Sequence, residues 1–174
     1  MKENFDASFA KVMQSEGGYV WDKDDAGGET NFGVTAGAWA AYLGRAVELG
    51  EMKALTKEQV KPFYRAMYWD KVKGDDLPSG VDYAAFDFAV NAGVARAAKF
   101  LQRAVGAVDD GVIGSGTLGR IAKTDPQKIL DSFAEQKQRF YNGLATTNPT
   151  QQKFLKGWLA RVDHVQDTAE SMLA

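Results

Sequence analysis

Apolar residues recur every three or four positions along most of the chain, which is the pattern of helices that bury one face. Ahead of two glycines the pattern runs through Phe5, Phe9, Val12 and Met13. The same periodicity predicts further helices over residues 37–49, 81–90 and 94–105, another around residues 57–68, and two that open at Pro126 and Pro149. No segment alternates apolar and polar residues for more than a few positions. The chain is therefore predicted to be mostly α, with at most a small hairpin or loop near residues 19–34.

Local signals mark where several of these helices begin. Thr56 and Gln59 form a capping-box pair, in which side chains and backbone N–H groups exchange hydrogen bonds across the first turn. Asp125 and Asn148, each followed by a proline, match the usual residues at a helix start. Pro62 is awkward inside its helix, because proline lacks an N–H and clashes one turn back. That helix should begin near Pro62 or kink there.

Polar residues interrupt the helix over residues 81–90, which is apolar on nearly all sides and should be buried. A buried carboxylate has to be paired or functional. Asp82, Asp87 and Asn91 could therefore bond neighbouring groups, or Asp87 and Asn91 could face a ligand. Trp69 leaves the same choice open, since its ring could fill the core or line a cleft.

Glu16 is the strongest candidate for chemistry. Gly17 and Gly18 follow it, and glycine ends helices because it adopts the left-handed conformation without a Cβ clash. Glu16 should then lie in the last helical turn, where unpaired carbonyls present roughly half a negative charge. That position and burial would both raise the pKa of its carboxyl. A carboxylic acid still protonated near neutral pH can act as a general acid.

The loop after Glu16 is rich in glycine and carries Tyr19 and the acids Asp22, Asp24 and Asp25. Such a loop is typical of a cleft wall. It could also be a tight surface loop with solvated acids.

Composition narrows the chemistry to carboxylates. The chain of 174 residues has no cysteine and one histidine, His164, which excludes thiolate metal sites and cysteine nucleophiles. No metal or cofactor is expected, and glycosidase chemistry uses the carboxylates that remain. The net charge of −2 gives no broad basic field, so nucleic acid is not an expected partner.

The hydropathy of the chain predicts no membrane insertion. No apolar run approaches the ~20 residues of a membrane span, and the N-terminus lacks the apolar region of a signal peptide. The protein is therefore expected to be made in the cytoplasm.

Residues 16–19 read Glu-Gly-Gly-Tyr, and residues 25–35 read Asp-Ala-Gly-Gly-Glu-Thr-Asn-Phe-Gly-Val-Thr. These two motifs resemble the phage muramidases and endolysins of glycoside hydrolase family 108. Ala26 replaces a proline and Val34 an isoleucine of the usual pattern, and neither change touches a chemical group. Residues 86–93 and the Gly-Trp-x-x-Arg motif at 157–161 also match this family.

This resemblance implies a lysozyme-like fold and hydrolysis of the β-1,4 bond between N-acetylmuramic acid and N-acetylglucosamine in bacterial peptidoglycan. Glu16 would protonate the glycosidic oxygen, Asp25 would be the base or electrostatic stabiliser, and Thr30 would orient a water. Asp22 and Asp24 remain alternatives to Asp25. A carboxyl separation of about 6.5–9.5 Å would imply inversion, and about 5–5.5 Å retention.

The resemblance also suggests which residues bind the glycan strand. The candidates are Tyr19, Asn31, Trp69, Asp87 and Asn91. Residues 108–117 are similar to the Asp-Gly-x-x-Gly-x-x-Thr signature of small peptidoglycan-binding modules, or they form a plain turn between helices. One lysozyme-like domain is expected over residues 1–174, with a catalytic part at 1–85 and a peptidoglycan-binding-like part at 86–174 packed on it.

Two other functions remain open. A lytic transglycosylase would cut the same bond with a single glutamate and release an anhydro-sugar. A peptidoglycan-binding protein without turnover could be built on residues 86–174. In the favoured interpretation the protein is a monomeric endolysin that acts on the cell wall after its release from the cytoplasm.

Overall fold

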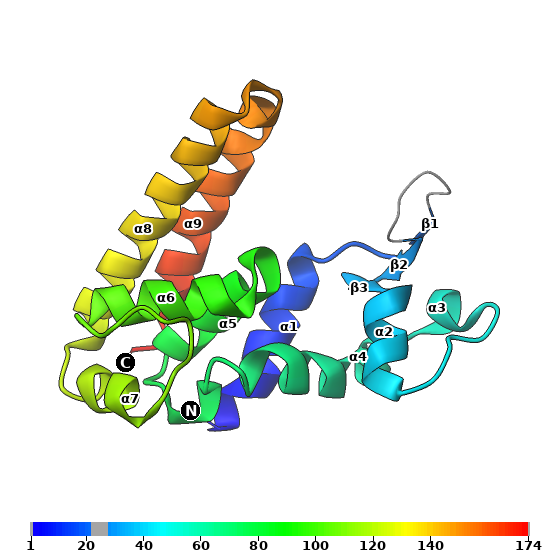
Figure 1. Ribbon diagram of the computed structural model, residues 1–174, viewed down its shortest axis with the longest axis horizontal. Coiled ribbons are helices and arrows are strands. Elements are labelled where there is room, and N and C mark those ends of the chain that lie inside the picture. Colours follow the sequence, from blue (N-terminus) through cyan, green and yellow to red (C-terminus); the bar gives the residue numbers. More distant parts are fainter. Residues whose placement is uncertain (1, 22–27, 174) are drawn as a thin grey trace. The chain divides into compact units, whose positions relative to one another are not determined.

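The computed structural model describes residues 2–21 and 28–173, which are predominantly helical (Figure 1). They form two compact units. Residues 6–67 make up the N-terminal unit, and residues 68–174 together with 1–5 make up the C-terminal unit. The predicted mostly α, lysozyme-like fold with a small hairpin near residues 19–34 is confirmed, since the strands lie between residues 20 and 35.

The N-terminal unit combines helices with a small antiparallel sheet. In chain order its elements are α1 (Phe5–Ser15), β1 (Val20–Trp21), β2 (Glu29–Asn31), β3 (Val34–Thr35), α2 (Ala36–Leu43), α3 (Glu51–Ala54) and α4 (Lys57–Tyr64). The central strand β2 pairs with both others, so that Thr30 lies opposite Val20 on one side and opposite Thr35 on the other. In α1 the predicted apolar stripe is buried at Phe9, Val12 and Met13.

Helix α2 is shorter than the helix predicted over residues 37–49. It ends because Gly44 adopts a left-handed conformation with φ of 68° and donates its N–H to the carbonyl of Ala40, which is the usual glycine stop. The loop that follows is tied to Glu51, which accepts two hydrogen bonds from the Arg45 guanidinium, each 2.9 Å long. These bonds lower the pKa of Glu51 to about 2.

Helix α4 begins at the predicted capping box, in which Thr56 and Gln59 bond each other's backbone N–H groups. Pro62 lies inside the helix, so the prediction that the helix begins near this residue is wrong. The helix does change form soon afterwards. A π-helical segment, η2 (Arg65–Trp69), follows directly.

The C-terminal unit is built from helices. Its elements are η1 (Lys2–Asn4), η3 (Gly74–Asp76), α5 (Val81–Ala92), α6 (Val94–Ala104), α7 (Ser115–Ile121), α8 (Pro126–Thr147), η4 (Pro149–Phe154) and α9 (Leu155–Glu170). Helix α5 is central, as predicted, because residues 81–89 are all buried. Its Phe88 packs edge-on against Phe133 of α8, with ring centroids 5.6 Å apart, and lies 5.1 Å from Phe100 of α6.

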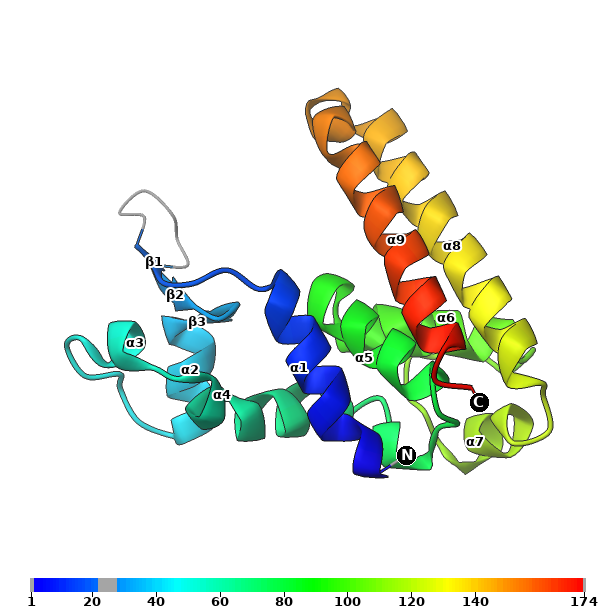
Figure 2. The ribbon, with the colours of Figure 1, turned by 180° about the vertical axis from the view of Figure 1, so that it is seen from behind.

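Helices α8 and α9 run side by side as a long hairpin, visible from both sides in Figures 1 and 2. Helix α8 starts as predicted, since the Asp125 carboxylate accepts from the Gln127 N–H at 3.0 Å. The second start differs from the prediction. Within the described part of the chain the Asn148 side chain accepts no capping bond from the backbone, and the chain passes through the 3₁₀ segment η4 before α9 begins at Leu155.

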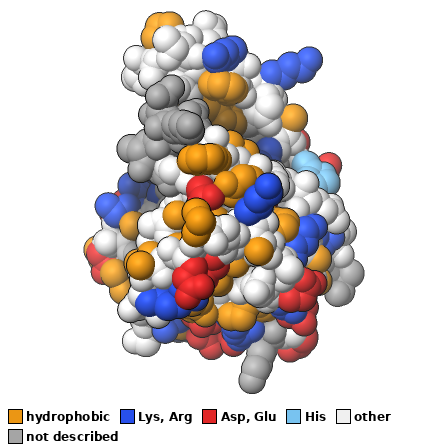
Figure 3. Space-filling view, turned by 90° about the vertical axis from the view of Figure 1, so that its right-hand side faces the viewer, with side chains coloured by type: hydrophobic (Ala, Val, Ile, Leu, Met, Phe, Trp, Pro, Cys, Tyr) orange, Lys and Arg blue, Asp and Glu red, His pale blue; other side chains and the backbone are white. Residues whose placement is uncertain are grey.

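The surface carries both signs of charge. On the face shown in Figure 3, acidic and basic side chains are interspersed with apolar ones. Among the residues that the structure describes, no helix is both long and apolar enough to cross a membrane.

Candidate active site

Glu16 directly follows the last residue of α1, one position later than a place inside the last helical turn would require. It is partly exposed. Its carboxylate lies against Gly33 in the turn between β2 and β3, so closely that a Cβ at position 33 would collide with Oε2. The helix end and the sheet therefore meet at the carboxylate of Glu16.

The β2–β3 turn has an unusual backbone at both central positions. Phe32 has a φ of 47° and Gly33 a φ of 74°, as in the tight hairpin turns that require left-handed residues at both places. A bulky residue in this region is rare and strained. Glycine at position 33 serves a double purpose, because it adopts the positive φ and leaves room for the carboxylate.

Tyr64 of α4 holds this turn in place. Its hydroxyl donates a 2.7 Å hydrogen bond to the carbonyl of Phe32. The same hydroxyl would lie 2.7 Å from a Cβ at position 33, so it shares the space above that glycine with the Glu16 carboxylate. The ring is 1% exposed and packs edge-on against Phe9 of α1. No local pattern in the sequence marks this hydroxyl as functional.

Glu29 and Thr30 point to opposite faces of the sheet, and Tyr19, just before β1, bonds to Glu29. Paired residues point to the same side and neighbours along a strand to opposite sides, so Thr30 shares a face with Val20, while Glu29 lies on the other face. Tyr19 donates a 2.6 Å hydrogen bond to Glu29, and this bond raises the pKa of the Tyr19 hydroxyl. Glu29 thus adds a carboxylate that was not among the predicted site residues.

Asn31 is 3% exposed, and its side chain donates a 2.8 Å hydrogen bond to the carbonyl of Met52 in α3. This contact ties β2 to α3 within the N-terminal unit. Asp25, the predicted second carboxylate, and its alternatives Asp22 and Asp24 lie outside the described residues.

Trp69 belongs to the C-terminal unit and has 0% exposure. Its indole N–H donates to Asp75 at 2.8 Å, and its ring packs edge-on against Phe5 and Phe86. Of the two interpretations of this ring, the structure favours the one in which it fills the core.

Asp87 of α5 is 2% exposed and faces two cations inside the C-terminal unit. Arg161 of α9 donates to its Oδ1 at 2.7 Å, and the Lys137 ammonium of α8 lies 3.7 Å from its Oδ2. Asn91 is exposed, and its side chain donates to the backbone carbonyl of Asp87 at 2.8 Å. This pairing favours a structural role for Asp87 and leaves Asn91 accessible.

The described residues contain no group of three or more histidine, cysteine, aspartate or glutamate side chains that could hold a metal ion. Among the described residues, the Glu16 carboxylate, the Tyr64 hydroxyl and the left-handed turn come together at Gly33. A carboxyl in such a place can donate or accept a proton.

Comparisons with known proteins show the family of the chain. Residues 9–93 match the family described as "Glycosyl hydrolase 108", and residues 96–163 match "Predicted Peptidoglycan domain". The solved structure of SagA from Brucella abortus is 42% identical to this chain, with a TM-score of 0.85, over 99% of this chain and 97% of its own. The chain belongs to glycosyl hydrolase family 108. No curated protein sequence matches.

Membership of family 108 makes the protein a glycoside hydrolase that degrades peptidoglycan. In this family 108 hydrolase the Glu-Gly-Gly-Tyr motif, residues 16–19, lies between the end of α1 and the start of β1. The hydrolase match includes the whole N-terminal site from Phe9 onward and continues through α5.

Proposed function

We propose that this hydrolase cuts the β-1,4 bond between N-acetylmuramic acid and N-acetylglucosamine, with Glu16 as the general acid. The observation that carries the proposal is the convergence of the Glu16 carboxylate and the Tyr64 hydroxyl above Gly33. Such crowding fixes the direction of a carboxylate that would otherwise be free to rotate at a helix end. A fixed direction is what proton transfer to a bound sugar requires.

In the proposed reaction Glu16 gives its proton to the glycosidic oxygen as the bond from that oxygen to the anomeric carbon breaks. Positive charge develops on the sugar ring, and a water molecule completes the hydrolysis. Asp25 is proposed to stabilise this charge or to activate the water, and Thr30 to orient the water. Tyr19 is the proposed glycan contact of the N-terminal unit, whereas the buried Asn31 is engaged by the carbonyl of Met52.

The test compares purified wild type with Glu16→Gln on purified peptidoglycan, followed by loss of turbidity. We expect the variant to be slower by about 10²–10⁴-fold, the usual contribution of a general acid. Glu58→Gln is the matched control, because Glu58 is exposed on α4 of the same unit. It should keep full activity, and circular dichroism should be identical for all three proteins.

Equal clearing by wild type and Glu16→Gln would show that Glu16 is structural and would overturn the proposed site. Mass spectrometry of the products tests the reaction itself. Hydrolysis leaves a reducing muramic acid end, whereas a transglycosylase leaves an anhydro-sugar that is lighter by one water. Asp25→Asn, measured alongside, should also be slower if this carboxylate takes part.

The proposal includes where the enzyme works. Because its substrate is the wall polymer, the hydrolase is proposed to act outside the cytoplasmic membrane as a monomer, in the manner of an endolysin. Sedimentation of the purified protein tests the monomer.

A further inference from the structure

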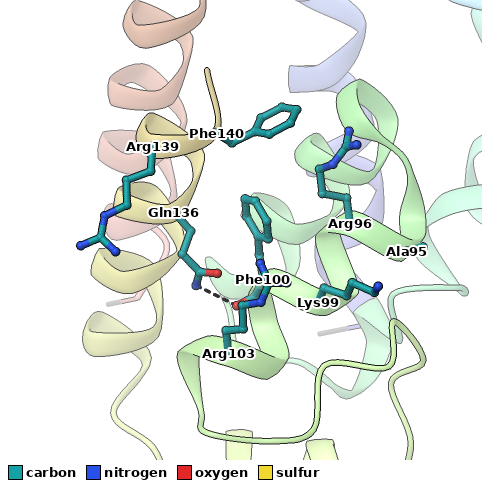
Figure 4. Close-up of a pocket in the computed structure, with 8 residues that line it drawn as sticks. All are labelled: Ala95, Arg96, Lys99, Phe100, Arg103, Gln136, Arg139 and Phe140. Carbon is teal, nitrogen blue, oxygen red and sulfur yellow. Dashed lines mark hydrogen bonds between the residues drawn. The ribbon is translucent and has the colours of Figure 1, made fainter. Parts of the chain in front are cut away.

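A pocket of about 750 Å³ lies between α6 and α8 of the C-terminal unit (Figure 4). The lining side chains are basic, aromatic or amide-bearing, apart from one alanine, and none carries a carboxylate. They are Ala95, Arg96, Lys99, Phe100, Arg103, Gln136, Arg139 and Phe140. The volume is within the range of roughly 300–1,000 Å³ that is usual for small-molecule sites.

One face of α6 supplies most of the positive charge. Arg96, Lys99 and Arg103 follow one another at helical spacing, so all three project from the same side of the helix (Figure 4). Arg103 forms an ion pair with Asp109 at 2.6 Å, and Arg139 pairs with Glu135 on its own helix. Within the described part of the chain, Arg96 and Lys99 form no ion pair. The pocket therefore keeps Arg96 without an ion pair, whereas Lys99 lies near enough to Asp109 and Asp110 for its charge to help lower the pKa of both carboxyls.

The position of Arg96 is fixed before any ligand arrives. Its guanidinium carbon lies 4.5 Å from the centroid of the Phe140 ring, and Nη1 donates to the carbonyl of Ala92 at 3.1 Å. A cation held over an aromatic face loses less freedom when it binds an anion. The rings of Phe100 and Phe140 also offer an apolar surface to the aliphatic part of a ligand.

Gln136 of α8 adds a hydrogen-bond acceptor to the pocket lining. Its Nε2 donates to the carbonyl of Phe100 at 3.0 Å, which fixes the direction of the amide. Its Oε1 is buried and has no hydrogen-bond partner among the described residues, at a cost of about 1–3 kcal/mol for a buried group. A turn of this amide toward the pocket would exchange the bond to Phe100 for one in which Oε1 accepts an N–H from a ligand.

We propose that this pocket binds the stem peptide of peptidoglycan through the peptide's carboxylates. The proposal rests on the peptidoglycan substrate given above. Among the parts of that polymer, the stem peptide has three features that match the pocket. Its carboxylates can pair with Arg96 and Lys99, and its N–H groups can donate to Gln136. Its short aliphatic side chains can pack on the two phenylalanine rings. A phosphate group would satisfy the cations but brings no N–H donor. The neutral sugars would leave the cations unpaired.

The test is calorimetric or NMR titration with a synthetic stem tetrapeptide, in the Glu16→Gln background so that no catalysis interferes. We expect the double variant Arg96→Gln/Lys99→Gln to bind the tetrapeptide at least 10-fold more weakly. The control Lys123→Gln/Lys128→Gln changes the net charge equally at exposed positions of the same unit and should bind like its parent. A tetrapeptide with amidated carboxylates should bind as weakly as the double variant binds the free peptide.

Equal binding of the tetrapeptide by the double variant and its parent would overturn the proposal, as would no binding by either. Binding of inorganic phosphate or of a chitin oligosaccharide that depends on Arg96 and Lys99, without peptide binding, would also overturn it and identify a different site. If the double variant does not fold, the two single variants serve in its place. Failure of the glycosidase proposal would be seen separately. In that case the wild-type protein would bind the tetrapeptide but would not clear the peptidoglycan suspension.

Discussion

Gly33 shows how a single backbone position controls the candidate catalytic carboxyl. It lacks the atom that would collide with Glu16 Oε2, and its φ of 74° is in the left-handed region. Any other residue would have to displace the Glu16 carboxylate or the Tyr64 hydroxyl and would also be strained. Because glycine has a hydrogen atom where alanine has a methyl group, residue 33 leaves the space that the Glu16 carboxylate occupies.

Gly33→Ala is therefore expected to lower the free energy of unfolding by more than about 1 kcal/mol, from the positive φ and the collision together. Peptidoglycan clearing should fall as well, because the Glu16 carboxylate must move. The measurements are urea unfolding and turbidity loss.

Gly143→Ala provides the contrast. Gly143 is exposed in α8, and a Cβ there would meet nothing within 4 Å. Alanine should stabilise that helix by roughly 0.5–1 kcal/mol and leave activity unchanged. If Gly33→Ala behaved like Gly143→Ala, the close contact with Glu16 would be refuted.

At the scale of single residues, the sequence predicted Glu16 as a site residue but gave no sign of the role of Tyr64. Glu16 stands before two glycines and inside a motif, so local signals mark it. Tyr64 lies in the apolar stripe of a helix, where a tyrosine looks like any other core residue. Its hydroxyl acquires a role only through the carbonyl of Phe32, 32 positions earlier in the chain, and such a distant partner leaves no local pattern.

At the scale of elements, helix starts were more predictable than helix ends and lengths. The capping box at Thr56 and the cap at Asp125 are local arrangements, and both formed as predicted. The helix predicted over 37–49 stopped at Gly44 instead, because a run of helix-compatible residues does not reveal which glycine will turn left-handed. Asn148 resembled Asp125 in sequence, yet a 3₁₀ segment follows it.

Three helices of the C-terminal unit are joined by the ion pairs of Asp87 with Arg161 and Lys137. Lys137 is 3% exposed, and burial lowers the pKa of its ammonium. Asp87→Asn would leave this buried cation without its counter-charge. We expect the variant to lose about 3–5 kcal/mol of unfolding free energy near pH 7, measured by urea unfolding.

The loss of stability in Asp87→Asn should depend on pH. Without Asp87 the pKa of Lys137 should fall further below its unfolded value of about 10.4, so the unfolded state binds more protons between the two values. The stability deficit of Asp87→Asn should then shrink as pH rises from 7 toward 10. Asp163→Asn, at an exposed position on α9, should change stability by no more than about 0.5 kcal/mol. A small, pH-independent effect of Asp87→Asn would contradict the account.

At the scale of the whole molecule, the two family matches do not coincide with the two compact units. The hydrolase match ends at residue 93, between α5 and α6, whereas the units divide between residues 67 and 68. Helix α5 thus belongs to the hydrolase family by sequence and packs on α6, α8 and α9. The sequence motifs led us to expect a catalytic part at residues 1–85 and a peptidoglycan-binding-like part at 86–174, but which helices pack together depends on contacts distant in the chain.

A fragment of residues 1–93 should therefore not fold as an independent hydrolase. It would retain the Glu-Gly-Gly-Tyr motif and expose the apolar sides of α5, which are buried from Val81 to Ala89 in the full chain. We expect aggregation or loss of cooperative unfolding, together with loss of peptidoglycan clearing. A soluble, active fragment that unfolds cooperatively would show that α5 does not need the helices that follow it.

The left-handed Phe32 has a meaning for protein engineering. Design rules would replace a strained phenylalanine in a tight hairpin turn with asparagine or glycine to gain heat tolerance. Here the backbone of Phe32 accepts the hydrogen bond from Tyr64, and the adjacent Gly33 lies against the Glu16 carboxylate. Engineering of a more heat-stable wall-degrading enzyme should therefore leave this turn unchanged and introduce stabilising substitutions in the exposed helices. The strained backbone of the turn is part of the proposed active site.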